Sequence, residues 1–277
     1  MNKETLTKLE RLKNTLRGME KLLIAFSGGV DSTFLLRVAQ EVLGENVMAV
    51  IASSETYPDK EIQDAVSLVK NWNVRYKVIQ TQELENPDFV SNPPQRCYFC
   101  KKELFTKLKE IAVREGIPYV ADGANFEDMD DFRPGLQAGK ELNVRSPLKE
   151  SFLLKSEIRE LSQEMGVPTW NKPSLACLSS RFPYYTEIDK KSLVQIAQAE
   201  EYLKSMGFAQ VRVRHHGQIA RIEVEPDEIL KAAGTEKRNR IVEKFKKIGY
   251  SYVTIDLAGY RTGSMNEPLP SDIKGKT

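Results

Sequence analysis

The stretch Ala25-Phe26-Ser27-Gly28-Gly29-Val30-Asp31-Ser32-Thr33 decides the fold. Before it, residues 21–26 form a short apolar run, which predicts a buried strand. After it, residues 32–43 repeat apolar side chains at helical spacing until Gly44, which predicts a helix and its end. The stretch therefore predicts a loop that joins the carboxyl end of a strand to the start of a helix.

The composition of this loop predicts that it binds phosphate. The adjacent Gly28 and Gly29 let the backbone turn tightly and approach a ligand closely. The amide groups of the loop and of the helix start then point at an anion, which the helix dipole also favours. Hydroxyl donors come from Ser27, Ser32 and Thr33. Asp31 would repel a phosphate, so its presence indicates a Mg²⁺ ion held beside the phosphates.

Outward from this loop, predicted strands alternate with predicted helices. The expected strands are residues 21–26, 47–52, 74–79 and 119–121, and the expected helices are 3–20, 32–43, 60–72, 101–115 and 156–165, with a loop at 86–95. This alternation predicts an α/β fold with a doubly wound parallel sheet. The loops 27–32, 53–59 and 122–135 follow strands, so we expect them at the carboxyl edge of the sheet, where ligands bind.

The pattern changes near residue 185, which predicts two domains, 1–185 and 186–277. The second reads as a smaller α+β domain, and we assign it substrate binding and oligomerisation. Its expected elements are helices 187–206 and 236–248, strands 210–214 and 219–225 paired around His215-His216-Gly217, and strand 252–257. The tail, residues 266–277, is expected to fray.

Charge and hydropathy exclude several classes of protein. Lys and Arg number 41 against 39 Asp and Glu in 277 residues, and a net charge of +2 argues against nucleic acid as a partner. The first 21 residues lack the apolar core of a signal peptide, and apolar runs such as 47–52 are too short to span a bilayer. We therefore expect a cytoplasmic protein without a membrane partner.

The three cysteines, Cys97, Cys100 and Cys177, point to metal or reactive chemistry, because an odd number in a cytoplasmic chain does not make a disulfide framework. Three thiolates are one short of a zinc or [4Fe–4S] ligand set, and an open iron could hold sulfide. Zinc could instead recruit His215 or His216. The alternatives are a redox pair formed by Cys97 and Cys100, or three unrelated buried thiols.

The loop lacks the spacing and the lysine of a Walker A motif. It resembles the PP-loop, S-G-G-x-D-S, of the ATP pyrophosphatase superfamily, which implies pyrophosphate release and transfer of AMP to a substrate. Ser53-Ser54-Glu55 and Asp122-Gly123-Ala124-Asn125, with Asp128, resemble downstream segments of that superfamily. The resemblance assigns ATP binding to Ala25, Ser27, Gly28, Gly29, Asp31, Ser32, Thr33, Ser54, Gly123 and Asp128.

Further segments resemble the LarE-type sulfur insertases, which help build the nickel-pincer nucleotide of lactate racemase. They include residues 132–136, 170–172, 179–184, 211–214, 220–223 and 256–263, so the likeness covers nearly the whole chain. It implies that a carboxylate of pyridinium-3,5-biscarboxylic acid mononucleotide attacks the α-phosphate of ATP. A sulfur nucleophile, supplied as sulfide or by a persulfide carrier, then displaces AMP. The family also implies a homo-oligomer, a hexamer.

That family divides by its sulfur source. In one branch a lone cysteine, at the place of Cys177, gives up its own sulfur. This chain also has Cys97 and Cys100, so it resembles the branch in which three cysteines hold a [4Fe–4S] cluster. Lys101, beside Cys100, could stabilise charge at the cluster or the adenylate, or be an exposed helix residue. The predicted cofactors are ATP, Mg²⁺ and this cluster.

The same resemblance assigns a set of polar residues to the substrate. Arg212 and Arg214 alternate on a predicted strand and suit a phosphate, although a solvated strand face is the alternative. Surface charge is the alternative for Glu200 and Glu223. The full predicted set is Arg133, Ser180, Arg181, Arg212, Arg214, Arg261, Glu200 and Glu223.

Three other functions are compatible with the loop. A tRNA thiolase shares the PP-loop and often a cluster, but the balanced charge and lack of a recognisable RNA-binding module argue against it. An amidotransferase-like ATP pyrophosphatase would not need three cysteines. A nucleotide-sensing binding protein would release no pyrophosphate.

Overall fold

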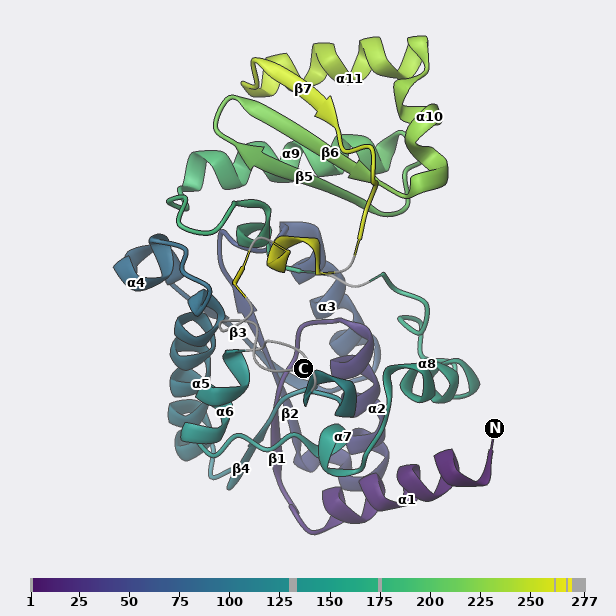
Figure 1. Ribbon diagram of the computed structural model, residues 1–277. Helices are drawn as coiled ribbons and strands as arrows, with labels where there is room; N and C mark the ends of the chain where they lie inside the picture. Colours follow the sequence, from purple (N-terminus) through teal and green to yellow (C-terminus); the bar gives the residue numbers. More distant parts are fainter. Residues whose placement is uncertain (1, 130–133, 174–175, 262, 268, 271–277) are drawn as a thin grey trace. The chain divides into compact units, whose positions relative to one another are not determined.

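The computed structural model describes residues 2–129, 134–173, 176–261, 263–267 and 269–270. The chain forms two compact units, shown in Figure 1. The first consists mainly of residues 1–83 and 95–175, and the second of residues 84–94 and 176–276. Each unit has its own sheet and its own hydrophobic core.

The sheet of the first unit is parallel throughout, with strand order β3-β2-β1-β4. Its strands are β1 (Leu22–Ala25), β2 (Val47–Ser53), β3 (Arg75–Gln80) and β4 (Tyr119–Ala121). Parallel strands need crossover connections, and the helices between them supply these. The four predicted strands and the predicted α/β class are therefore confirmed.

The helices of this unit are α1 (Lys3–Arg17), α2 (Val30–Leu43), α3 (Asp59–Asn71), α5 (Arg96–Arg114), α6 (Gly135–Glu141), α7 (Pro147–Glu150) and α8 (Lys155–Glu164). Sequence reasoning missed α6 and α7, which are too short to show a clear helical period.

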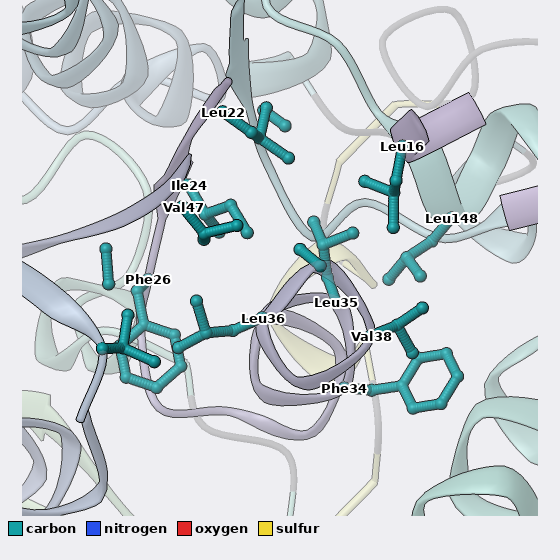
Figure 2. Close-up of a cluster of buried hydrophobic side chains, with 14 of the residues drawn as sticks. Leu16, Leu22, Ile24, Phe26, Phe34, Leu35, Leu36, Val38, Val47 and Leu148 are labelled. Atoms are coloured by element: carbon teal, nitrogen blue, oxygen red, sulfur yellow. The ribbon is translucent and has the colours of Figure 1, made fainter. Parts of the chain in front are cut away.

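Helices cover both faces of this sheet because successive side chains of a strand point to opposite sides. Figure 2 shows Leu22 and Ile24 of β1 on the side that faces Leu36 of α2. Leu23 lies between them in sequence and packs instead with Phe105 of α5. Each of these side chains is fully buried, which stabilises the fold by about 1.5–3 kcal/mol per residue. The sheet is thus doubly wound, as predicted.

Helix α5 begins five residues earlier than predicted, at Arg96 rather than Lys101. The prediction that the cysteine pair precedes this helix was wrong, because Cys97 and Cys100 lie inside its first two turns. Pro93 and Pro94 stand just before the helix, where rings without an N–H do not interrupt the hydrogen bonds of a helix. The apolar pattern that reveals α5 in the sequence starts only at its buried residues farther along.

The second unit contains a mixed sheet in the order β5-β6-β7. Strands β5 (Val211–His216) and β6 (Ile219–Val224) are antiparallel, whereas β6 and β7 (Tyr252–Ile255) are parallel. The parallel pair follows from the helical crossover between β6 and β7. Its helices are α4 (Pro87–Val90), within the predicted loop 86–95, and α9 (Lys190–Ser205), α10 (Ile229–Ala233) and α11 (Thr235–Ile248).

The predicted domain boundary, residue 185, falls inside the second unit. Backbone hydrogen bonds explain this: Tyr185 donates to Asn92 O at 2.9 Å, and Ile188 donates to Val90 O at 2.9 Å. These bonds attach the segment 84–94 to the residues that lead into α9. Residues 268 and 271–277 of the predicted frayed tail lie outside the described residues.

Within the part of the chain that the structure describes, no helix combines the length and the apolarity needed to cross a membrane.

The turn at Gly28 generates a prediction for stability. Gly28 has φ of 67°, and an added Cβ would lie 3.0 Å from Ala65 Cβ, so alanine there is both strained and crowded. We expect Gly28→Ala to lower the free energy of unfolding by about 2–3 kcal/mol, measured by urea denaturation.

Gly116→Ala is the matched control, because Gly116 has φ of 63° but open space around the added Cβ. Strain alone should cost about 1 kcal/mol there. Equal losses in the two variants would show that Ala65 gives way and that crowding contributes nothing.

Candidate active site

The phosphate loop lies between β1 and α2, as predicted, and is ordered by its own hydroxyl groups. Ser27 Oγ lies 3.1 Å from Ser32 Oγ, which also accepts a hydrogen bond from Ser27 N at 3.3 Å. Gly29 occupies the N-cap of α2 and has no side chain to accept bonds from the first helical amides. Those amides are therefore available to an anion, and the helix dipole attracts one.

Asp31 lies in the first turn of α2, and its carboxylate fits the predicted role of a Mg²⁺ ligand. Its Oδ2 lies 2.5 Å from Lys155 Nζ. Its Oδ1 is buried and has no hydrogen-bond partner among the described residues. A buried carboxylate oxygen without a partner is costly unless something else binds it, and carboxylate oxygens are the ligands that Mg²⁺ prefers.

Two further loops follow the strands that neighbour β1, so they lie at the same carboxyl edge of the sheet as the phosphate loop. The loop after β4 touches α2, because a Cβ on Gly123 would lie 2.9 Å from Ser32 N. In the same loop Asp128 Oδ2 accepts a hydrogen bond from Asn125 N at 3.0 Å. After β2, Ser54 Oγ lies 2.7 Å from Thr56 Oγ1. Ala25 ends β1, so the residues predicted to bind ATP follow the ends of adjacent strands.

Two lysines that sequence reasoning did not select also reach this loop. Lys155 pairs with Asp31 across 124 positions of sequence. Lys172 Nζ donates to Gly28 O at 3.1 Å and lies 2.7 Å from Glu61 Oε2. Lys172 belongs to a segment that carries the family resemblance, which is a weak signal, whereas nothing local distinguishes Lys155.

Cys97 and Cys100 lie one turn apart on α5, so their side chains share one side of the helix. Cys97 is exposed and Cys100 is partly buried. Thiolates near a helix N-terminus are favoured by its dipole, and paired thiolates are the usual ligands of iron–sulfur clusters. The pair thus fits the predicted cluster. Lys101 Nζ lies 5.1 Å from the centre of the Phe105 ring.

A buried carboxylate beside this pair was also missed. Glu83 is 2% exposed, and its Oε1 lies 3.5 Å from Cys100 Sγ and accepts a hydrogen bond from Thr81 Oγ1 at 3.0 Å. Its position after β3 gave no sequence signal. It supplies an acceptor for the Cys100 thiol in this structure.

Cys177 belongs to the second unit, where it precedes a short 3₁₀ helix, Leu178–Arg181. Its carbonyl accepts hydrogen bonds from Ser180 Oγ at 2.9 Å and from Arg181 Nη1 at 3.0 Å, which orient the backbone at the cysteine. Within the described part of either unit, no disulfide forms and no three His, Cys, Asp or Glu side chains are grouped to hold a metal ion.

Arg181 and Glu200 form a buried, bidentate ion pair with N–O distances of 2.7 and 2.9 Å. Burial opposes the charge on Glu200, but the Arg181 guanidinium outweighs it, so the pKa of Glu200 lies below its ordinary value. Arg181 also donates to the carbonyls of Ala176 and Cys177. One guanidinium therefore joins α9 to the segment that carries Cys177.

Arg214 and Glu223 form a second bidentate pair across β5 and β6, at 2.9 and 2.7 Å. Arg212 lies over the Tyr260 ring, 5.2 Å from its centre, and burial together with the charge of Arg181 lowers its pKa. All three of these charged β-strand residues are less than a tenth exposed. The alternatives of a solvated strand face and of surface glutamates are therefore wrong.

The remaining predicted substrate residues differ in how they are placed. Ser180 Oγ accepts a hydrogen bond from Arg181 Nη1 at 2.8 Å. Arg261 is partly exposed, pairs with Glu267 at 3.1 Å and donates to Gly259 O at 3.2 Å. Arg133 lies outside the described residues. His215, a possible zinc ligand in the sequence, is buried in β5 with Nδ1 3.3 Å from the Tyr250 hydroxyl.

A parallel sheet whose first strand leads through S-G-G-x-D-S into a helix defines a PP-loop ATP pyrophosphatase.

The NAD synthase family model matches residues 5–90. An uncharacterized protein of Synechocystis sp. is 43% identical over 95% of this chain and 98% of its own length. Pyridinium-3,5-bisthiocarboxylic acid mononucleotide synthase of Lactiplantibacillus plantarum is 39% identical over 95% of each chain. An uncharacterized protein of Methanocaldococcus jannaschii is 32% identical over 93% of this chain and 98% of its own length. The chain belongs to the LarE-type family of PP-loop ATP pyrophosphatases.

The buried pair Arg181–Glu200 generates a prediction. Glu200→Gln leaves a buried guanidinium without its counter-charge. We expect this substitution to lower the free energy of unfolding by about 3–5 kcal/mol at pH 7. The folded-state pKa of Glu200 is lowered, so this stabilisation is present above its ordinary value of 4.5 and lost as the pH falls through the folded-state value. Urea denaturation of the wild type and of Glu200→Gln should show that the difference between their free energies of unfolding shrinks as the pH falls below 4.5.

Glu243→Gln is the control, because the Glu243–Lys247 pair at 2.6 Å is mostly exposed. Its removal should leave the free energy of unfolding nearly unchanged. A Glu200→Gln protein as stable as the wild type at pH 7 would contradict the importance of the buried pair.

Proposed function

We propose that the chain is an ATP-dependent sulfur insertase of nickel-pincer nucleotide biosynthesis. Its substrate is pyridinium-3,5-biscarboxylic acid mononucleotide, and its product is the corresponding thiocarboxylate. The observation that carries the proposal is the full-length identity of 39% to a pyridinium-3,5-bisthiocarboxylic acid mononucleotide synthase, which includes both the phosphate loop and the second unit.

The proposed reaction has two steps. A substrate carboxylate oxygen attacks the α-phosphorus of ATP, the bond to the bridging oxygen breaks, and pyrophosphate leaves. Hydrosulfide then attacks the acyl carbon, the bond to AMP breaks, and a thiocarboxylate, AMP and a proton result. Adenylylation is needed because a bare carboxylate is a poor electrophile, whereas AMP is a good leaving group.

In the first step the phosphate loop does the binding. The first amides of α2 would donate hydrogen bonds to the phosphates, and Asp31 would hold the Mg²⁺ that offsets their charge. Ser54, Gly123 and Asp128 complete the proposed nucleotide site at the same edge of the sheet.

The substrate is assigned to the arginines of the second unit and to Arg133. Guanidinium groups suit a phosphate because they present several donors in a fixed geometry. Glu200 and Glu223 fix Arg181 and Arg214 through bidentate pairs, and the other donors of both arginines bind Ser180. A substrate phosphate would take the place of some of these bonds, and the support for the assignment is that the two arginines meet at Ser180.

The proposed metal centre is a [4Fe–4S] cluster ligated by Cys97, Cys100 and Cys177, with Lys101 as a nearby counter-charge. When bound, the cluster would hold the sulfur that displaces AMP. Sulfide or a persulfide carrier would supply that sulfur. Thiolate ligands need a reducing compartment, so we keep the cytoplasm as the expected location. The homo-oligomer, a hexamer, also stays a prediction.

Pyrophosphate release tests the adenylylation step. Wild-type protein should release pyrophosphate from ATP only when the pyridinium mononucleotide is present. Asp31→Asn removes the charge that would hold Mg²⁺, and we expect release to slow by about 10²–10³-fold. Lys109→Ala, at a partly exposed position of α5 outside the proposed nucleotide site, is the control that loses a charge without affecting the rate.

Other outcomes would favour the rival functions. Release that requires tRNA would indicate a tRNA thiolase. Full activity with ammonia in a protein lacking all three cysteines would indicate an amidotransferase-like enzyme. No release with any of these substrates would leave a nucleotide-binding protein.

Iron and acid-labile sulfide analysis under anaerobic conditions tests the cluster. Wild-type protein should hold about four irons per chain and absorb broadly near about 400 nm. Cys97→Ala, Cys100→Ala and Cys177→Ala should each lose both signals. Tyr98→Phe is the control, since it removes only the hydroxyl that donates to Glu141 at 2.7 Å and keeps both neighbouring cysteines.

Failure to hold iron after anaerobic reconstitution would overturn the cluster but not the adenylylation step. The next measurement would then be mass spectrometry of Cys177 after one turnover. Conversion of Cys177 to dehydroalanine would identify its own sulfur as the source.

A further inference from the structure

Glu83 is a buried carboxylate that takes no part in the proposed reaction. It follows β3 and is 2% exposed. Its Oε1 accepts hydrogen bonds from Thr81 Oγ1 at 3.0 Å and from Cys100 Sγ at 3.5 Å. Its Oε2 is also buried and has no hydrogen-bond partner among the described residues. A buried carboxylate oxygen without a partner is costly, so it indicates a ligand that the two hydrogen bonds do not account for.

The distance between Glu83 and Cys100 indicates what kind of ligand this is. A metal ion bound tetrahedrally by a thiolate at about 2.3 Å and a carboxylate oxygen at about 2.0–2.2 Å holds the two donor atoms roughly 3.5 Å apart. The Sγ–Oε1 distance is 3.5 Å, so the two groups already have the separation of two ligands of one ion. Ligands of two different irons in a [4Fe–4S] cluster lie farther apart, because both irons stand between them.

Cys97 can supply a third ligand. It lies three positions before Cys100, so both side chains are on the same side of α5. It is exposed, so its side chain has room to turn toward Cys100. Two donors rather than three are in place in this structure, in agreement with the lack of a three-residue metal-binding group among the described residues. The helix dipole favours thiolates in the first turns of α5, and metal binding would release the thiol protons to solvent.

We propose that Glu83, Cys97 and Cys100 form a binding site for one divalent transition-metal ion, such as Fe²⁺ or Zn²⁺. Water would complete a tetrahedral set of ligands. All three residues belong to the first unit, whereas Cys177 belongs to the second. The site therefore needs neither Cys177 nor ATP, and it goes beyond the proposed sulfur insertion. It would hold a single ion at a stage before Cys177 joins in binding the proposed cluster.

The test is a Co²⁺ titration of the full-length protein, reduced and freed of metal by a chelator, in the absence of oxygen. Co²⁺ binds to the same kinds of ligand as Fe²⁺ and Zn²⁺, and its bonds to thiolates give a charge-transfer absorption that reports binding directly. The wild type and Cys177→Ala should each bind one Co²⁺ per chain with equal affinity. Glu83→Gln keeps the shape of the side chain but removes its charge, and it should weaken binding by about tenfold to a hundredfold.

Glu110→Gln is the matched control, because Glu110 is an exposed carboxylate on the same helix, 3.7 Å from Arg114. It should bind Co²⁺ with wild-type affinity. Thermal unfolding of every variant is measured alongside. X-ray absorption of the Co²⁺-loaded wild type tests the site without any substitution at Glu83, and it should show two sulfur ligands with oxygen completing the set.

Equal Co²⁺ affinity in Glu83→Gln and the wild type would overturn the inference. Loss of binding in Cys177→Ala, or a third sulfur ligand in the absorption spectrum, would also overturn it, because the site would then need the second unit. A wild-type protein that binds no Co²⁺ would overturn it as well. None of these results bears on pyrophosphate release, so failure of the metal site and failure of the proposed function are distinguishable.

Discussion

Two close backbone contacts constrain the phosphate loop, and the proposed chemistry of the first unit depends on them. A Cβ at Gly28 would meet Ala65 of α3, and a Cβ at Gly123 would meet the backbone of Ser32 in α2. The loop therefore lies pressed between α3 and the segment after β4. With its turn fixed in this way, the first amides of α2 can converge on one anion without reorganising.

The charges around this loop are arranged for a ligand that brings both a cation and an anion. Asp31 alone would repel phosphate, and its pairing with Lys155 leaves Oδ1 without a hydrogen-bond partner among the described residues. In this structure the pair of Asp31 and Lys155 lies at the start of α2, where the proposed Mg²⁺ and nucleotide phosphates would bind.

The second unit depends on the pairing of buried charges. Its arginines are buried, and a buried charge is tolerated only when it is paired and hydrogen-bonded. Glu200 and Glu223 satisfy this condition for Arg181 and Arg214, while the Tyr260 ring covers Arg212. Because Arg181 also donates to the carbonyl of Cys177, the same pair that stabilises the unit orients the segment that carries this cysteine.

The sequence by itself determined the parallel α/β unit, the phosphate loop and the family. These follow from apolar periodicity, adjacent glycines and motif residues, which act through contacts between neighbours along the chain. Only the tertiary structure decided that α5 begins at Arg96, that Glu83 lies beside Cys100, and that Lys155 and Lys172 reach the loop. Those two lysine contacts join residues 124 and 144 positions apart, and no local pattern encodes a contact that exists only once the sheet has brought distant segments together.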